Sequence, residues 1–250
     1  MSDVDENFVQ GNSRRIFLNT ELGCSSSCTY CYLPQLGFPI GARLNTKRAT
    51  AQEVLDSLGS NADFVPGNSG TLISIGCFSE CWDPKNRGTT IEIIRKMLPL
   101  GNRIQLATKR RIKLHELQNL EDLPGAKSQL SIYVSSATLA GWSEYEPGTA
   151  PPEKRFLSFE ACRLAGLTAF LYIKPVIQNV TIKDVETYGL VMQKYSVDVI
   201  VGDRFDTGEQ VGQVSPISRK LKIIEESDVA RIKCALQKYG RVFGSSTETI

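Results

Sequence analysis

Three cysteines stand close together near the start of the chain, at Cys24, Cys28 and Cys31. Their spacing, C-x3-C-x2-C, lets three thiolates wrap a cuboidal four-iron, four-sulfur cluster and bind three of its irons. Small residues between the cysteines allow backbone amides to turn toward the sulfurs, and such hydrogen bonds help to set the cluster potential. The fourth iron would have no protein ligand, so it would be open to the amino and carboxylate groups of a small molecule.

A zinc site is the alternative interpretation of the same cysteines. Structural zinc takes four ligands, usually from paired Cys or Cys/His motifs. His115 is the only histidine in the chain, and it falls on a weak, polar helical pattern where a surface position is expected. Cys77 or Cys81 could supply a fourth thiolate. From the residues alone, zinc binding and thiols without any ligand therefore both stay open.

Composition favours an ordinary cytoplasmic protein. The 250 residues are 41% hydrophobic and 22% charged, and the net charge of +2 creates no global field that favours nucleic acid or membrane. No stretch approaches the ~20 apolar residues that span a bilayer, and the acidic start of the chain is unlike a signal peptide. Seven cysteines without a secretory signal favour metal-binding or catalytic thiols over disulfides.

Strand-like and helix-like runs alternate along the chain, which predicts an α/β fold with parallel strands. The expected strands are near-continuous apolar runs, as for strands covered on both faces: Arg15–Thr20, Thr71–Gly76, Arg103–Thr108, Gln129–Ser135, Thr168–Ile173 and Asp198–Val201. The expected helices are Ala51–Leu58, Thr90–Leu98, Lys113–Leu120, Pro152–Ala165, Thr181–Tyr195 and Ser227–Tyr239. Six such units fit an open doubly wound sheet or a full or partial barrel. We expect residues 1–14 to be an N-terminal extension and residues 15–250 to form one core domain.

Polar and sulfur-bearing residues follow the ends of the expected strands. Parallel α/β folds place their chemistry at the carboxyl ends of the strands, so these residues should meet at one edge of the sheet. They are the cysteine loop from Cys24 onward, Cys77 to Glu80, Lys109, Ser135, Lys174 and Asp203-Arg204.

The cysteine loop of residues 24–33, followed by Glu146-Pro147-Gly148-Thr149 and Arg155, resembles the radical S-adenosylmethionine (SAM) superfamily. More narrowly, it resembles spore photoproduct lyase and related DNA-repair-type radical SAM proteins, over about residues 15–176. The resemblance implies a partial (β/α)6 barrel and a [4Fe-4S] cluster on the three cysteines. It also implies an external one-electron reductant, flavodoxin- or ferredoxin-like. The cluster would cut SAM reductively to a 5′-deoxyadenosyl radical that abstracts a hydrogen atom from the substrate.

The resemblance also implies roles for individual residues. Four positions match residues that contact SAM: Tyr30 beside the cluster, Ser79, Lys109 near the SAM carboxylate, and Ser135 near the ribose. Each has a simpler explanation, since an aromatic can pack in the core, a lysine can be solvated, and a serine can merely end a strand. We treat the four as candidate cofactor-binding residues.

Two further positions match catalytic residues of the lyase. Cys77 lies after the second strand, where the lyase carries its hydrogen-donating cysteine, and Tyr32 matches a tyrosine implicated in returning the hydrogen atom. A buried cysteine that packs as a small hydrophobe is the alternative for Cys77. Cys162 and Cys234 fall inside expected helices, where we expect core positions.

The substrate is less constrained than the chemistry. This chain departs from the lyase pattern in three places. The segments before and after the region that resembles the lyase are shorter than in the lyase, and the Cys81-Trp82 pair and Lys174 differ from it. A nucleic acid or a nucleotide is the leading expectation for the substrate. A small metabolite or peptide is the second hypothesis, and a zinc-stabilised binding protein without catalysis is the third.

Overall fold

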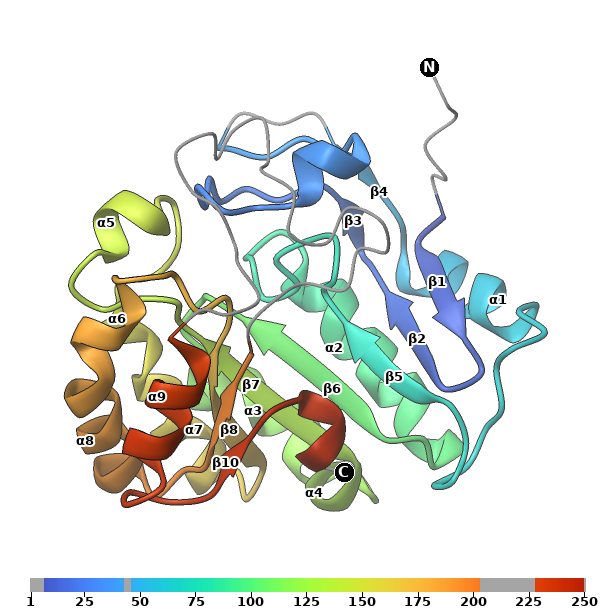
Figure 1. Cartoon of the computed structure of the whole chain (residues 1–250). Helices are drawn as coiled ribbons and strands as arrows, with labels where there is room; N and C mark the ends of the chain where they lie inside the picture. The colour runs from blue at the N-terminus through green and yellow to red at the C-terminus, as the bar shows by residue number, and fades with distance from the viewer. Residues whose placement is uncertain (1–6, 43–45, 203–227, 250) are drawn as a thin grey trace.

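The computed structural model describes residues 7–42, 46–202 and 228–249, and within them the main feature is an open, curved sheet of eight strands (Figure 1). The strand order is β1-β2-β5-β6-β7-β8-β9-β10. The antiparallel pair of β1 and β2 forms one edge, and every other pairing is parallel. The strands are β1 (Val9–Asn12), β2 (Arg15–Leu18), β5 (Leu72–Ile75), β6 (Ile104–Thr108), β7 (Leu130–Ser135), β8 (Thr168–Ile173), β9 (Val199–Val201) and β10 (Val242–Phe243). A separate ribbon pairs β3 (Glu21–Leu22) with β4 (Lys47–Arg48).

Helices follow the strands and cover one face of the sheet (Figure 1). They are α1 (Ala51–Gly59), α2 (Arg87–Met97), α3 (Leu114–Glu121), α4 (Ala126–Gln129), α5 (Trp142–Tyr145), α6 (Pro152–Arg155), α7 (Leu157–Leu164), α8 (Val185–Tyr195) and α9 (Val229–Leu236). Short 3-10 turns add η1 (Leu33–Leu36), η2 (Leu98–Leu100), η3 (Thr181–Asp184) and η5 (Ser246–Thr249). In the described residues, no helix has the length and apolarity needed to cross a bilayer.

All six expected parallel strands are present, so the α/β prediction and its partial-barrel form are confirmed. The strands β1 and β10 were not expected. The first contains Gly11, a poor strand residue, and the second has two residues, too few to show a period. The division at residue 15 stays a prediction, although β1 already belongs to the same sheet as β2.

The expected helices are found with shifted bounds. Helix α1 begins at the predicted capping box, in which the Thr50 hydroxyl accepts from the Glu53 amide and the Glu53 carboxylate accepts from Thr50. Helix α2 starts at Arg87, before the expected Thr90. The expected helix Pro152–Ala165 is divided into α6 and α7 at Phe156, and Thr181–Tyr195 begins as η3 before α8. The start of the last expected helix and Asp203-Arg204 lie outside the described residues.

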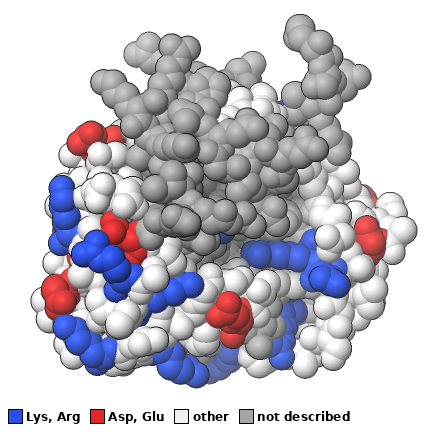
Figure 2. All heavy atoms as spheres, viewed as in Figure 1, with Lys and Arg blue, Asp and Glu red and all other residues white. Residues whose placement is uncertain are grey.

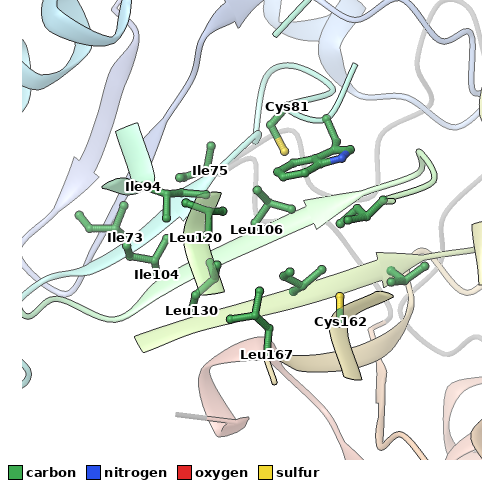
Figure 3. Packing of buried hydrophobic residues seen from close by; sticks show 14 of the residues in the cluster. Ile73, Ile75, Cys81, Ile94, Ile104, Leu106, Leu120, Leu130, Cys162 and Leu167 are labelled. Carbon is green, nitrogen blue, oxygen red and sulfur yellow. The ribbon is translucent and has the colours of Figure 1, made fainter. Parts of the chain in front are cut away.

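The parallel strands alternate between two environments, as the two-residue period of a strand requires. Their helix-facing side chains form one apolar core with the helices (Figure 3): Ile16, Leu18, Ile73, Ile75, Ile104, Leu106, Ile132, Val134, Leu171 and Ile173. The residues between them face the concave side of the sheet, which we call the lumen. These include Arg15, Phe17, Ser74, Gln105, Ala107, Tyr133, Ser135 and Tyr172.

The expectation that the strands are covered on both faces is confirmed, since β5 and β9 are buried along their whole length, but the lumen face is not uniformly apolar. The runs are apolar on the helix side, whereas the lumen side carries serine, glutamine, arginine and tyrosine around a cavity. Polar residues are tolerated there because the lumen leaves space for hydrogen-bonding partners. One face of each strand thus stabilises the fold, and the other is available for binding.

The core should tolerate little loss of volume. We expect Ile94→Ala in α2, where the side chain is fully buried, to lower the free energy of unfolding by about 2–5 kcal/mol because it leaves a cavity. The matched control is Leu190→Ala in α8, whose side chain is 60% exposed. We expect the control to change stability by less than about 0.5 kcal/mol. Urea denaturation followed by circular dichroism measures both, and equal losses would contradict this description of the core.

Candidate active site

The lumen holds a cavity of about 260 Å³ that opens at the carboxyl ends of the strands. Nine residues singled out from the sequence line it, although they come from several segments far apart in the chain. They are Cys24, Cys28, Tyr30, Cys31, Tyr32, Cys77, Ser79, Lys109 and Ser135. The fold therefore brings all of the candidate site residues to one place, while their individual roles remain predictions.

The cysteine loop is held by backbone contacts to the segment Tyr145–Gly148. The Ser27 amide donates to the Pro147 carbonyl at 2.9 Å, and the Thr29 amide donates to the Tyr145 carbonyl at 3.0 Å. Gly148 has a φ of 79°, and a Cβ there would lie 3.3 Å from the Ser26 Cα. A larger residue would be strained and would press on the cysteine loop. The Glu-Pro-Gly-Thr stretch thus serves as the surface on which the cysteines rest.

A second clamp holds the other side of the same loop. The Arg110 guanidinium donates to Ser25 Oγ at 2.8 Å and to Asp83 Oδ2 at 3.0 Å, and Ser25 also donates to Asp83 at 2.7 Å. Arg110 further donates to the Gly148 carbonyl. Burial opposes ionisation of Asp83, but the Ser25 and Arg110 contacts outweigh it and lower its pKa. Sequence analysis assigned no role in the site to Asp83 or Arg110, since nothing local links the two residues.

The three thiols are suited to a ligand that stabilises their charged form. Burial raises the pKa of Cys24 and Cys28, and it raises the pKa of Cys31 to about 12, so the bare thiols hold their protons at neutral pH. The Ser26 amide donates to Cys24 Sγ at 3.4 Å, and the Leu33 amide opposes the shift of Cys31. Iron supplies the positive charge that buried thiolates require, so this donor set fits an iron–sulfur cluster.

Within the described ranges, no group of three or more His, Cys, Asp or Glu side chains is arranged to hold a metal ion. A single ion needs its ligands around one point, whereas the thiolates of a cluster each bind a different iron. Cys81, one proposed fourth ligand, is fully buried in the apolar core, and its thiol donates to the Ala107 carbonyl at 3.4 Å.

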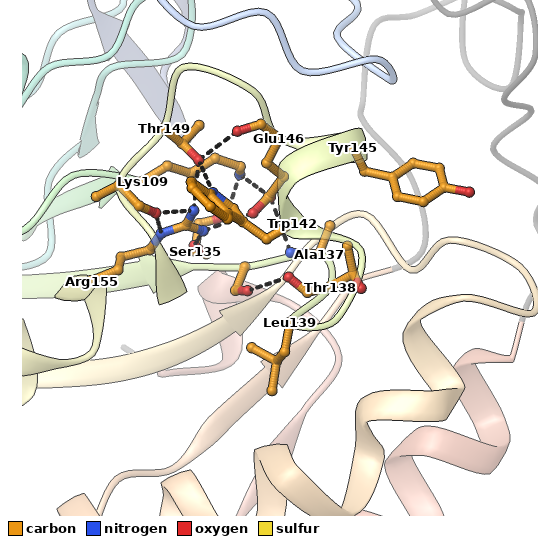
Figure 4. A network of polar contacts seen from close by, with 12 residues as sticks. Lys109, Ser135, Ala137, Thr138, Leu139, Trp142, Tyr145, Glu146, Thr149 and Arg155 are labelled. Carbon is orange, nitrogen blue, oxygen red and sulfur yellow. Dashed lines mark hydrogen bonds and ion pairs between the residues drawn. The ribbon is translucent and has the colours of Figure 1, made fainter. Parts of the chain in front are cut away.

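A buried ion pair lies behind the cysteine loop (Figure 4). Arg155 Nη1 donates to Glu146 Oε2 at 2.9 Å, and both side chains are 0% exposed. The other oxygen, Glu146 Oε1, accepts from the Tyr30 hydroxyl and, at 3.1 Å, from the Ala137 amide. Burial by itself would raise the pKa of Glu146, but Arg155 and then Lys109 outweigh it, so the pKa is lowered. The carboxylate is therefore charged and fully hydrogen-bonded.

Arg155 spreads this contact to the neighbouring backbone. Its guanidinium donates to Thr149 Oγ1 at 2.8 Å, to the Ala150 carbonyl at 2.7 Å and to the carbonyl of Ser135. Ser135 ends β7 and lines the cavity. Glu146 and Arg155, which both belong to the family resemblance, thus form an ion pair that ties the support of the cysteine loop to a strand end.

Three of the predicted SAM contacts surround one part of the cavity. Lys109 Nζ donates to Ser135 Oγ at 2.6 Å and lies 3.7 Å from Glu146 Oε1 and 5.8 Å from the centre of the Tyr30 ring. Ser79 is buried, yet its hydroxyl has no hydrogen-bond partner among the described residues. A buried polar atom without a partner is costly unless a ligand or water satisfies it. The Ser79 hydroxyl therefore marks a place where a polar ligand fits.

Glu80, which the sequence placed at a strand end without a role of its own, joins the same wall. Its carboxylate accepts from the Lys109 amide at 2.9 Å, from the Trp82 amide at 3.1 Å and from the Thr108 hydroxyl at 2.5 Å. It thereby fixes the loop after β5 against the end of β6. The signal in the sequence was the position of Glu80 directly after Ser79, a candidate SAM contact at a strand end. The sequence did not show which residues Glu80 would contact.

The two predicted catalytic residues touch each other. The Tyr32 hydroxyl lies 3.2 Å from Cys77 Sγ and donates to the Cys77 carbonyl at 2.5 Å, although the residues are 45 positions apart. Burial raises the pKa of Cys77, and the Tyr32 hydrogen bond, Arg15 and Lys174 only partly oppose it. The thiol is therefore protonated at neutral pH and faces the cavity beside a phenol.

The remaining cysteines separate into two environments. Cys162 is fully buried in α7, as expected. The expectation of a core position for Cys234 is wrong, because this residue is exposed on α9. An α-helix that packs on a sheet leaves one face in solvent. The presence of Cys234 inside a helix therefore did not decide whether its side chain faces the core or the solvent.

The described chain resembles solved structures in fold. A spore photoproduct lyase with bound AdoMet and dinucleoside spore photoproduct aligns with a TM-score of 0.58 and 14% identity, over 90% of this chain and 72% of that one. Streptococcus suis SuiB bound to S-adenosylmethionine aligns with a TM-score of 0.60 and 12% identity, over 93% of this chain and 50% of that one. No protein-family model and no curated protein sequence matches the chain. The likeness establishes the fold, which is that of the radical SAM enzymes.

The buried ion pair should dominate the stability of the site. We expect Glu146→Gln to lower the free energy of unfolding by about 3–5 kcal/mol, because it leaves the Arg155 charge buried without its partner. Urea denaturation at pH 7 measures the loss. Glu160→Gln is the matched control, since Glu160 pairs with Arg163 on the surface, and it should leave stability nearly unchanged.

Glu146 should also make the free energy of unfolding depend on pH in the acid range. The pKa of Glu146 is lower in the folded chain than its ordinary value, so its stabilisation is fully present above the ordinary glutamate pKa. That stabilisation is lost as the pH falls through the lower, folded-state pKa. We expect the stability difference between wild type and Glu146→Gln to shrink along this path. A difference that stays constant down to acid pH would show that Glu146 does not titrate with unfolding.

Proposed function

We propose that this chain is a radical SAM enzyme that cleaves S-adenosylmethionine reductively and uses the radical to abstract a hydrogen atom from a substrate. The observation that carries the proposal is the convergence of the three-cysteine loop and six further candidate residues on one cavity, at the carboxyl edge of a radical SAM fold. Cys24, Cys28 and Cys31 would hold a [4Fe-4S] cluster through three irons. The donor set, three buried thiols with backbone amides nearby, supports this assignment.

The residues around the cluster would hold and orient SAM. When bound, the cluster and SAM supply a one-electron cleavage of the sulfonium to methionine and a 5′-deoxyadenosyl radical. Ser79 offers a hydroxyl in need of a partner, and Lys109 offers a cation suited to a carboxylate. Ser135 lies within hydrogen-bond distance of Lys109, and Tyr30 forms a wall braced by Glu146. The narrow lumen would exclude water from a reactive carbon radical.

Cys77 and Tyr32 would complete the reaction as hydrogen-atom donors. The Cys77 S–H bond breaks as the thiol gives its hydrogen atom to a carbon-centred product radical, which forms a C–H bond. The sulfur radical then lies within hydrogen-bond distance of the Tyr32 hydroxyl and can regain a hydrogen atom from it. A thiol held in its protonated form by burial has the hydrogen atom to give.

A nucleic acid or a nucleotide is the substrate class that we propose. The support is the fold likeness to a lyase whose solved structure holds a dinucleoside photoproduct. The electron would come from an external flavodoxin- or ferredoxin-like protein. A small metabolite or peptide would be handled by the same radical chemistry. The non-catalytic zinc protein is the alternative that the following experiment separates.

Anaerobic reconstitution tests the cluster assignment. With iron, sulfide and a reductant, the wild-type chain should turn brown, bind about four irons per chain, and release 5′-deoxyadenosine from SAM. We expect Cys24→Ala, Cys28→Ala and Cys31→Ala each to lose the bound iron and the cleavage. Cys234→Ala is the matched control and should retain both, because Cys234 is exposed on α9 outside the cavity. A colourless protein that binds zinc and never cleaves SAM would leave only the binding-protein alternative.

The protonation state of Cys77 has its own test. Thiolates, and not thiols, react with iodoacetamide, and burial raises the pKa of the Cys77 thiol. At pH 7.5 we expect Cys77 to be alkylated at least about tenfold more slowly than exposed Cys234, as followed by peptide mass spectrometry. Equal rates would mean that Cys77 is a reactive thiolate, which is unsuited to hydrogen-atom donation.

A further inference from the structure

The cavity is unevenly charged. Among the described residues, its lining includes three basic ones, Arg15, Lys109 and Lys174, and one acidic one, Glu80. The Glu80 carboxylate is already engaged by Lys109, Trp82 and Thr108. On the outer surface, by contrast, Lys and Arg are interspersed with Asp, Glu and uncharged residues over the described part of the face in Figure 2. A low-dielectric cavity with an excess of one sign attracts ligands of the other sign.

Arg15 is the basic residue that the proposed SAM contacts leave unexplained. It begins β2, and its Nε donates to Ser74 Oγ at 2.7 Å. Ser74 of β5 is aligned with Phe17, two residues further along β2, so the Arg15 side chain extends along the lumen in the direction of the strand. The guanidinium lies 4.8 Å from the centre of the Phe17 ring. Arg15 thus points along the lumen toward the edge where Cys77 stands, and the charge of Arg15 partly opposes the rise in the pKa of Cys77 that burial causes.

The C-terminal segment fixes the orientation of this arginine. Gln105 Nε2 donates to the Ser246 carbonyl at 2.7 Å, which obliges Gln105 Oε1 to point the other way. That oxygen accepts from Arg15 Nη2 at 3.1 Å. The floor of the lumen therefore contains a chain of hydrogen bonds that runs from η5 through Gln105 of β6 to Arg15 of β2, and β5 lies between these two strands in the sheet. Such a chain of hydrogen bonds holds the guanidinium in one position before any ligand arrives.

Arg15 keeps unused binding capacity. A guanidinium has five N–H donors, and Ser74 and Gln105 take two of them. No carboxylate of the described residues forms an ion pair with Arg15. A half-buried arginine with a fixed orientation and no counter-ion among the described residues is arranged for a carboxylate or phosphate, the anions that match its planar fork.

The opposite wall of the lumen is aromatic. The Tyr133 ring stacks on Phe170, with centroids 5.4 Å apart, and lies 5.6 Å from Tyr172. Tyr133 and Tyr172 both line the cavity, and the Tyr133 hydroxyl is tied to Thr249 of η5 at 2.7 Å. Tyr133 is buried and backs the half-buried Tyr172, whose flat ring is the surface on which a planar ligand can stack.

From this juxtaposition we propose that the lumen binds a substrate made of a planar ring that carries an anionic group, with the ring against Tyr172 and the phosphate or carboxylate on Arg15. The inference rests on the proposed function, and it names the substrate class of the same site. It makes Arg15 a specificity-determining residue and places the substrate beside Cys77, the proposed hydrogen donor. Lys174 also lines the cavity.

Binding of paired probes tests the proposal without need of turnover. The probes are uridine 5′-monophosphate against uridine, and orotate against uracil, since pyrimidines avoid competition with the adenine of SAM. Each is titrated calorimetrically into the full, iron-reconstituted chain with SAM present. In at least one pair we expect the anionic member to bind about 10- to 100-fold more tightly. The first pair reports a phosphate and the second a carboxylate.

Variants assign the preference to a residue. Arg15→Gln should abolish most of the anion advantage, and Arg15→Lys should retain part of it, because the charge stays but the fork is lost. Arg14→Gln is the matched control, as Arg14 is exposed and outside the cavity, and it should keep the full advantage. Thermal unfolding checks that each variant folds. If Arg15→Gln does not fold, Arg15→Lys alone tests the proposal.

The outcomes separate this inference from the proposed function. Equal affinity within both pairs, no binding of either anionic probe, or an advantage that survives in the Arg15 variants would overturn the anion subsite. A chain that cleaves SAM but shows one of these results loses only the subsite. A chain that prefers the anionic probes through Arg15 but never cleaves SAM loses only the proposed function.

Discussion

The site depends on one fully buried carboxylate. Glu146 and Arg155 are both 0% exposed, and a charge in that position is costly unless its partners are all in place. The partners of Glu146 come from the cysteine loop through Tyr30, from the segment after β7 through Ala137, and from α6 through Arg155. The charge therefore makes these three segments assemble together, because any one of them displaced would leave the carboxylate unsatisfied.

The cysteine loop is rigid for the same kind of reason. Its backbone donates to Tyr145 and Pro147 on one side, and Ser25 is held by Arg110 and Asp83 on the other. Both supports are themselves anchored to strand ends. A loop that must present three thiols at fixed positions needs such an outer layer of contacts, since the ligands alone do not set their own geometry. The flexibility expected of a polar loop is thus removed by contacts from distant parts of the chain.

The strands serve stability and binding at once. In each strand, alternate residues bury Ile, Leu and Val against the helices, while the residues between them, such as Arg15, Gln105 and Tyr133, face the lumen. The proposed cluster and SAM site occupies the carboxyl edge, and the proposed anion subsite lies deeper, above a floor that η5 closes through Gln105 and Tyr133. Cys77 and Tyr32 lie at the carboxyl edge, where a radical formed on the substrate would meet its hydrogen donor.

The sequence by itself determined the six parallel strands, the helix pattern and the residues expected at the strand ends. Those signals are local: apolar period, capping residues and cysteine spacing act within a few positions. Only the tertiary structure decided that Tyr32 touches Cys77, that Arg110 and Asp83 clamp the cysteine loop, that Arg15 faces a lumen and that Cys234 is exposed. These outcomes depend on the register and curvature of the sheet and on how each helix rotates against it. The contacts between residues far apart in the chain set those variables, and no short stretch of sequence encodes them.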